Sequence, residues 1–425
     1  MKKLLWILAI LLVLFIGLIY LSVSVGNKTL NTAEIITAED FEEVDFKKHD
    51  SVFVAASTLY RGNFLKDFMQ GENYREAWAT PVKFPVVYLD TLLGGLKIIK
   101  EGGGSQTHSL KLQSESGIIY SLRSINKFPD SHIPQLAKHL GLENIVNDGI
   151  SAQHPYGAIP AAALAEEAGL LHTHPVKVFV PKQEMLGKYN TNYGNKLFLL
   201  EFETKGETNW TNLENVEKIL ETEDLQELKI KQRKNLKIDK DILVRARLFD
   251  LLIGDWDRHA NQWGWILQQK DGKYNAIPLA GDRDNAFFKL EGLVPGIISN
   301  RNIQPMVRPF EAEIDYLPGL VYPFDVYFLK NVPKEVFIRE AKFLQKVLTD
   351  DKIEAALHHW PQQIHELNGK EIAAKIKQRR EDLVKYATAF HKIIQEKPLL
   401  NKPLKGSENL ELTQELMNCF DCLEE

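Results

Sequence analysis

The sequence predicts an α+β protein of two lobes, with a β-rich half followed by a mostly helical half. Short apolar runs separated by Gly-rich and SESG turns fill residues 96–125, as in antiparallel strands. Apolar residues at helical spacing dominate residues 242–253 and 335–395. The chain has 425 residues, more than a single ordinary core supports. An N-terminal membrane helix and a C-terminal helical appendage complete the predicted architecture.

Composition is that of a folded globular protein, with 44% hydrophobic and 26% charged residues. The formal net charge is −5, and no block of Lys and Arg forms a basic field. We therefore expect no nucleic-acid partner.

The first 26 residues are read as a signal anchor. Lys2 and Lys3 precede a stretch without charge at residues 4–25, which at about 1.5 Å per residue spans a bilayer core of about 30 Å. A cleavable signal has a shorter apolar region and an A-x-A-like exit, whereas this one ends in SVSVGN. We expect a single-pass anchor with the body outside the cytoplasm, and export after cleavage as the alternative.

The β-rich lobe is expected at residues 86–204, after a spacer and N-terminal extension at 27–85. Within it the patterns predict three antiparallel strands, a helix at 161–172 and two further strands, the strands lying near 96–100, 108–113, 118–125, 176–181 and 196–204. The HTH sequence at His172 and His174 is read as a turn at the end of that helix rather than a metal site.

The helical lobe is expected at residues 205–334. A polar helix is predicted around 212–228, and a buried helix at 242–253 with Gly254 as its stop. Its N-cap is Asp239 or Asp241. WGWIL, the Asp271-Gly272 turn and YNAIPLA then predict a hairpin.

Residues 335–425 are expected to form C-terminal helices and a tail, with a break at Pro361. The tail carries the only two cysteines, Cys419 and Cys422, and no nearby histidine set completes a zinc site. We expect at most a local disulfide there.

Polar residues around the hairpin suggest phosphoryl transfer. Asp257 follows the buried helix, Gln262 lies five residues later, and Asp282 and Asp284 follow the hairpin. An antiparallel hairpin returns its ends to one place, so these side chains can meet. Phosphoryl transfer needs a carboxylate that steers a hydroxyl and oxygen ligands for Mg²⁺.

The motifs Asp257-Arg258-His259 with Gln262, and Asp282 with Phe287, resemble those of atypical kinases. That group includes HipA-type and CotH-like kinases, type II phosphatidylinositol 4-kinases and secretory-pathway casein kinases. The resemblance implies a bilobal protein-kinase-like fold and use of ATP, or another nucleotide triphosphate, with Mg²⁺ or Mn²⁺. It makes Asp257 the catalytic residue and Asp282 a metal ligand.

Other roles stay open within this resemblance. Asp284 competes with Asp282 as the metal ligand, because Asp284-Asn285 also matches D-N; the aromatic at Phe287 favours Asp282. His259 either orients the catalytic loop or serves its structure. Gln262 takes the place of an Asn or Glu metal ligand, but it is neutral and longer than Asn.

A kinase also needs a nucleotide-binding lobe. Gly103 and Gly104, in GGGSQTHSLKL, are candidates for a hairpin that covers phosphates. In YSLRSINK, Arg123 or Lys127 corresponds to the phosphate-pairing lysine of kinases. Glu166 or Glu167, in the following helix, would be the acidic partner of that cation.

Segments across residues 70–395 also resemble an uncharacterised exported bacterial family, which supports the fold rather than an activity. The expected function is phosphate transfer to a hydroxyl of a protein, lipid or glycan. A nucleotide-binding pseudokinase or scaffold is the alternative, since Gln262 departs from the kinase pattern. A metal-dependent phosphoesterase is the less favoured third candidate, because the GNH motif and the late His ligands of such enzymes are missing from this sequence.

Overall fold

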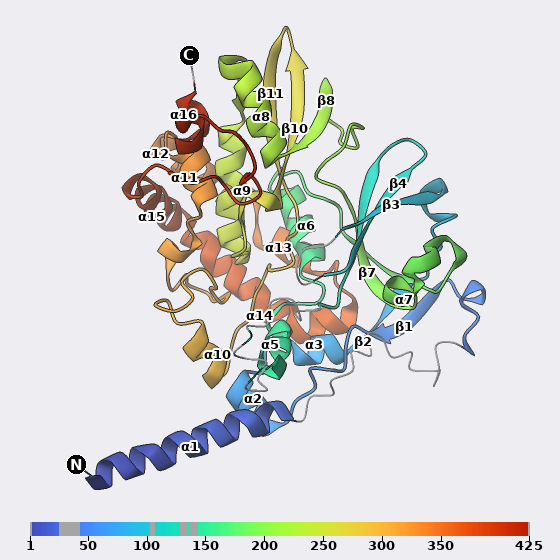
Figure 1. The fold of residues 1–425 in the computed structure, drawn as a ribbon, viewed down its shortest axis with the longest axis vertical. Helices are drawn as coiled ribbons and strands as arrows, with labels where there is room; N and C mark the ends of the chain where they lie inside the picture. Colours follow the sequence, from blue (N-terminus) through green and yellow to red (C-terminus); the bar gives the residue numbers. More distant parts are fainter. Residues whose placement is uncertain are drawn as a thin grey trace.

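The computed structural model describes residues 2–24, 43–102, 107–127, 135, 139 and 143–423. Figure 1 shows one lobe built around β3 (Leu96–Gly102), β4 (Ser109–Ser114) and β7 (Lys196–Phe202), and a second lobe built around α9 (Lys240–Ile253) and the C-terminal helices. The α+β class predicted from the sequence is confirmed. The candidate site lies between the two lobes.

The first lobe is a five-stranded sheet in the order β3-β4-β5-β7-β6, with every neighbouring pair antiparallel. Its strands are β3 (Leu96–Gly102), β4 (Ser109–Ser114), β5 (Ile119–Ser124), β6 (Val176–Val180) and β7 (Lys196–Phe202). All five predicted strands are therefore confirmed. Alternate side chains such as Leu110, Leu122 and Phe198 fill a separate small core beneath the sheet.

Helices connect this sheet to the rest of the chain. They are α5 (Glu143–Gly149), α6 (Ala158–Glu167) and the short α7 (Asn190–Tyr193). The predicted helix at 161–172 corresponds to α6, which ends before Gly169, at φ +64°. The predicted turn at His172 and His174 is also found, outside any helix or strand.

The second lobe contains a four-stranded sheet in the order β8-β10-β11-β9. Its strands are β8 (Val216–Glu221), β9 (Leu236–Ile238), β10 (Trp263–Lys270) and β11 (Lys273–Ala280), and α8 (Thr222–Gln232) lies between β8 and β9. The predicted polar helix at 212–228 was wrong in its first half. Residues 216–221 pair with β10 instead, so tertiary hydrogen bonding overrides a weak helical pattern.

The central helix α9 (Lys240–Ile253) agrees with the sequence. The Asp239 carboxylate accepts a hydrogen bond from the Ile242 backbone N–H, which decides between the two predicted caps. Gly254 ends the helix in the left-handed conformation, at φ +70°. A Cβ on Gly254 would lie 2.5 Å from the ring of Phe310, so both the backbone conformation and the space available favour glycine there.

Most of the C-terminal helices share the core of α9 rather than forming a separate body, and four of them, α11, α12, α14 and α15, pack directly against it. They are α10 (Leu293–Ile298), α11 (Pro323–Leu329), α12 (Lys334–Val347), α13 (Asp350–Leu357), α14 (Gln362–Glu381), α15 (Leu383–Glu396) and α16 (Gln414–Asn418). Pro361 precedes α14, as the sequence predicted. Cys419 and Cys422 form the expected local disulfide.

Residues 51–85, expected as an N-terminal extension, belong to this large core. They form β1 (Ser51–Ala55), α2 (Phe64–Gln70), α3 (Arg75–Ala79) and β2 (Pro81–Pro85), and β1 pairs with β2. The helix α1 (Lys2–Ser24) runs out from the body beside α2 (Figure 1). Its span Lys2–Val23 is long and apolar enough to cross a membrane, and none of its most apolar window is buried.

Candidate active site

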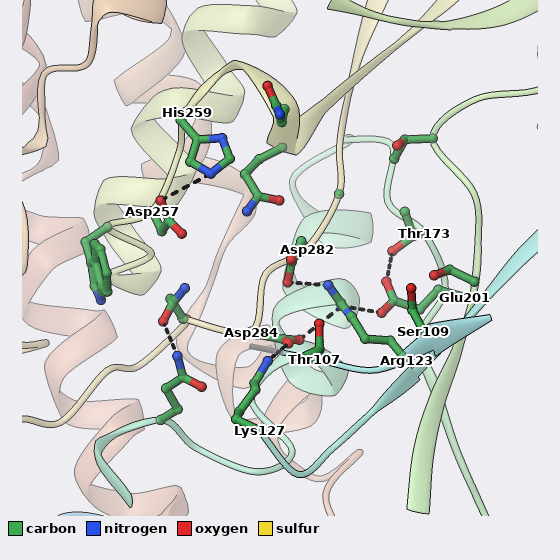
Figure 2. Close-up of a pocket in the computed structure, with 18 of the residues that line it drawn as sticks. Thr107, Ser109, Arg123, Lys127, Thr173, Glu201, Asp257, His259, Asp282 and Asp284 are labelled. Carbon is green, nitrogen blue, oxygen red and sulfur yellow. Dashed lines mark hydrogen bonds and ion pairs between the residues drawn. The ribbon is translucent and has the colours of Figure 1, made fainter. Parts of the chain in front are cut away.

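A cleft of about 840 Å³ separates the five-stranded sheet from the second lobe. Figure 2 shows Arg123 and Lys127 reaching from the sheet side toward Asp282 and Asp284, with Asp257 across the cleft. Most of the residues singled out in the sequence thus meet in one place. Gln262 and His259 line the same cleft.

Arg123, on β5, lies at the centre of an ion-pair network. Its guanidinium pairs with Asp282, with Asp284 at 3.1 Å and with Glu201 at 2.5 Å. The Lys127 ammonium pairs with Asp284 at 2.5 Å. Two cations of one lobe thus bind two carboxylates of the other, so the network joins the lobes across the cleft.

The acidic partner of Arg123 was predicted wrongly. Glu166 is exposed on α6, and Glu167 pairs with Lys352 at 2.6 Å. The partner is Glu201 on β7, which also accepts a hydrogen bond from the Thr173 hydroxyl at 2.5 Å. Strand pairing decides this, because β7 lies directly beside β5 in the sheet. Only a buried Glu in the apolar run KLFLLEF signals it in the sequence.

The pKa values of two carboxyl groups in this network are shifted in opposite directions. Burial raises the pKa of Asp282, but Arg123, Lys127 and Arg258 outweigh it and hold that pKa at about 2. Burial raises the pKa of Glu201 above its usual value despite the lowering effect of Arg123. Asp282 is therefore a full anion at neutral pH, as a metal-binding carboxylate must be.

Asp282 also has an unusual backbone. Its φ is +46°, in the left-handed region that non-glycine residues rarely adopt. Phe287, five residues later, has φ +62° and is fully buried. The Tyr74 hydroxyl donates to the Phe287 carbonyl at 2.5 Å. Strain held in place by such buried contacts is typical of functional loops.

Asp257 lies on the opposite loop, where α9 gives way to β10. Its side chain is 28% exposed toward the cleft, and its backbone N–H donates to the Asp255 carboxylate at 3.3 Å. The His259 Nε2 lies 3.7 Å from Asp257 Oδ1, too far for a direct hydrogen bond. Burial lowers the pKa of His259 while Asp257 raises it, and the net shift is downward, which keeps the ring neutral near pH 7.

Arg258 ties the two loops together, a role not predicted from the sequence. Its fully buried guanidinium donates to the Gly281 carbonyl at 2.8 Å and to the Gln262 carbonyl at 3.3 Å. It also pairs with Asp250 at 3.2 Å. The loop that carries Asp257 and the loop that carries Asp282 are therefore held by one cation.

Below the loops, charged side chains of α9 complete this support. Asp250, fully buried, also pairs with Arg247 at 3.0 Å and with Arg283 at 3.3 Å. Burial raises the pKa of Asp255 to about 8, although Arg258 lowers it. Arg247 and Asp250 on the apolar face of a predicted buried helix were the available signal, because such charges are buried only with partners.

The cleft offers oxygen ligands that suit a hard divalent cation. Among the described residues no three His, Cys, Asp or Glu side chains converge as a ready metal cage. Mg²⁺ in nucleotide sites does not need one, because one or two carboxylates and the phosphates complete its shell. Asp282, Asp284 and the amide oxygen of Gln262 are the fitting donors on this chain.

Two further sets of residues complete the description of the cleft. Gly103 and Gly104 lie outside the described residues, so the predicted phosphate-covering hairpin stays a prediction. Lys405, from the C-terminal tail, lines the cleft and was not singled out in the sequence. Asn285 lines it too, and its amide oxygen accepts from Gln153 at 2.8 Å.

Comparison with known proteins gives weak overall similarities. The chain is similar to the proinflammatory kinase CtkA of Helicobacter pylori, with 14% identity, a TM-score of 0.37, and coverage of 71% of this chain and 96% of that one. It is also similar to HipA of a Shewanella oneidensis toxin–antitoxin complex, with 12% identity, a TM-score of 0.32, and coverage of 74% and 68%. No family model and no curated protein matches the chain.

Proposed function

We propose that this protein is a kinase-like phosphotransferase, which transfers phosphate from a nucleotide triphosphate to a hydroxyl group. The observation that carries the proposal is the meeting of two loops with one cationic strand. Asp257 and Asp282 come from loops locked together by Arg258, and Arg123 faces them from the sheet. Phosphoryl transfer needs little covalent chemistry from the protein and depends on such positioning.

The nucleotide would bind between the lobes, with its phosphates near Arg123 and Lys127. Both cations are already paired with Asp282 and Asp284, so phosphates and a divalent cation would exchange partners within one network. Mg²⁺ or Mn²⁺ supplies charge neutralisation of the phosphate oxygens when bound, with Asp282, Asp284 and Gln262 as its holders. Arg123 keeps a second anchor in Glu201, which maintains its orientation.

In the transfer step, the substrate hydroxyl oxygen attacks the γ-phosphorus. A new O–P bond forms, and the bond from the γ-phosphorus to the β,γ-bridging oxygen breaks. The hydroxyl proton passes to the Asp257 carboxylate, and the nucleoside diphosphate leaves. Asp257 suits this role because it is partly exposed to the cleft while its backbone N–H is held by the buried Asp255.

Two measurements on the full chain in detergent micelles test the proposal. Thermal-shift titration with ATP should raise the melting temperature only with Mg²⁺ or Mn²⁺, and Asp282→Ala should abolish that shift. Incubation with γ-³²P-labelled ATP should label the wild type, and Asp257→Ala should lose about 10²- to 10⁴-fold in rate while keeping its shift. Asp271→Ala, at the exposed turn of the β10–β11 hairpin, is the matched control for both.

The outcomes separate the candidates. No shift with any nucleotide and metal pair refutes nucleotide binding and the kinase together. A metal-dependent shift without label transfer favours the second candidate, a nucleotide-binding pseudokinase. The position of Gln262 favours that candidate, since its side chain lines the cleft where the related motifs carry the shorter Asn or the charged Glu.

We also propose that α1 anchors the protein in a membrane, with the body outside the cytoplasm. Its exposed apolar surface and the preceding Lys2 and Lys3 support this reading. Protease added to intact cells should digest the body if it lies outside, and should leave it whole if it faces the cytoplasm. Because free ATP is scarce outside cells, this orientation also decides where the nucleotide must come from.

A further inference from the structure

One end of the protein carries a patch of exposed apolar side chains beside α1. The helices α2 and α10 and the loop that follows α10 contribute it. Its members are Phe64, Phe68, Leu293, Ile297, Ile298 and Ile303. Phe64 is 87% exposed, Phe68 58% and Ile303 59%. Single exposed hydrophobic residues are common on protein surfaces, but a group of such strongly exposed ones marks an interaction site. We call this surface the α2–α10 patch.

The patch is built from contacts that fix its two helices to each other. The backbone of Gly71, at the end of α2, lies so close to the segment that leads into α10 that a Cβ there would be 2.4 Å from the Glu291 carbonyl oxygen. The Asn73 amide oxygen accepts from the Glu291 backbone N–H at 3.0 Å. The rings of Phe64 and Phe68 stack with centroids 6.5 Å apart. The apolar side chains are therefore presented together on a defined surface.

The last turn of α1 is attached to α2, which carries part of the patch, and to α5, which contacts α2. The Gln70 amide donates to the Ser22 hydroxyl at 2.9 Å, and the Asn144 amide donates to the Val23 carbonyl at 3.3 Å. Figure 1 shows α2 and α10 near the end of α1 where it meets the body. The 22-residue span of α1 is about 33 Å long, close to a hydrocarbon core of about 30 Å. Ser22 would then lie at the membrane boundary, and α2 with it.

We infer that the α2–α10 patch docks onto the surface of the membrane that α1 crosses. The segment LVPGII of α10 has no charge, and its exposed isoleucines suit the boundary between headgroups and acyl chains. The bilayer is the occupant because the patch continues the apolar surface of α1 at the level where α1 leaves the membrane. This inference rests on the proposed anchor.

Docking also bears on the cleft. Leu290, three residues before α10, and Val307, nine residues after it, both line the cleft. Contact between the patch and the bilayer therefore fixes one wall of the cleft relative to the membrane.

Site-directed fluorescence on the full chain tests the inference. The two native cysteines form a disulfide, so single introduced cysteines can be labelled with an environment-sensitive fluorophore. Ile303→Cys reports on the patch and Leu14→Cys on the anchor. Leu399→Cys is the control, because it is also an exposed apolar residue but adjoins Leu400, which bonds to α16 at the opposite end from α1 (Figure 1).

Each labelled chain is placed in nanodiscs, one chain per disc, with nitroxide on the lipid acyl chains. We expect the labels at positions 14 and 303 to lose about half of their emission and the label at 399 to keep it. The double change Phe64→Asp with Phe68→Asp should return the label at 303 to the level of 399 and leave that at 14 quenched.

Other results overturn the inference in distinguishable ways. Quenching at 14 without quenching at 303 refutes docking and leaves the anchor standing. No quenching at 14 refutes the anchor, and docking with it. If the label at 303 is protected from water only when two chains share one disc, the patch binds a second copy of this chain and not lipid.

Discussion

Replacing Arg258 by Met tests whether one buried cation holds the two candidate catalytic loops together. Arg258 is fully buried, pairs with Asp250 and Asp255, and donates to the carbonyls of Gly281 and Gln262. Methionine is close to it in size but offers neither charge nor donor. The substitution therefore leaves buried acceptors unsatisfied without opening a large cavity.

The magnitude follows from which partners remain. Asp250 keeps Arg247 and Arg283, so its charge stays compensated. Asp255 loses the cation that lowers its pKa, and breaking a buried pair costs about 3–5 kcal/mol. The Gly281 and Gln262 carbonyls lose their donor as well, so we expect the free energy of unfolding to fall by about that amount at pH 8, where about half of Asp255 is ionised in the folded wild type.

The pH dependence gives a second, independent signature. A carboxyl group with a folded pKa above its unfolded value binds more protons when folded, so it adds stability as pH falls. Burial places the pKa of Asp255 at about 8, and loss of Arg258 raises it further. The difference in unfolding free energy between wild type and Arg258→Met should therefore shrink between pH 8 and pH 6.

Urea unfolding of the full chain in detergent micelles, followed by tryptophan fluorescence at pH 6, 7 and 8, measures both quantities. Arg61→Met is the control, since Arg61 is exposed and should give a wild-type curve. A loss below about 1 kcal/mol at pH 8, or a loss that is clearly larger at pH 6 than at pH 8, would refute the role given to Arg258.

Two further predictions concern the framework. Gly254→Ala should cost about 1–3 kcal/mol more than Gly272→Ala in urea unfolding, because both have φ near +70° but only Gly254 adds a clash, with Phe310; equal costs would contradict this. Burial lowers the pKa of His154 to about 3, so the unfolded state, with a pKa near 6.5, binds the proton first as pH falls. This should remove about 2 kcal/mol of stability between pH 6.5 and pH 5, and His154→Asn should lose that part of the slope.

Local patterns in the sequence were sufficient for much of this protein. Gly254 ended the buried helix, the Asp271-Gly272 turn closed the hairpin, and alternation marked the strands, since these features depend on neighbours along the chain. The same patterns brought Asp257 and Asp282 to one cleft, because a hairpin returns its ends to the same place.

Tertiary structure decided the partners of these residues. Glu201, and not Glu166, faces Arg123, because the order of strands places β7 beside β5. Residues 216–221 form strand β8 rather than half of the predicted helix, because they form hydrogen bonds with β10. The sequence thus determined most of the elements and the chemical types at the site, through short-range periodicity and turn geometry. Long-range packing decides which charges pair across the cleft, and it also places Arg258 where it holds both loops. No local pattern in the sequence encodes this packing.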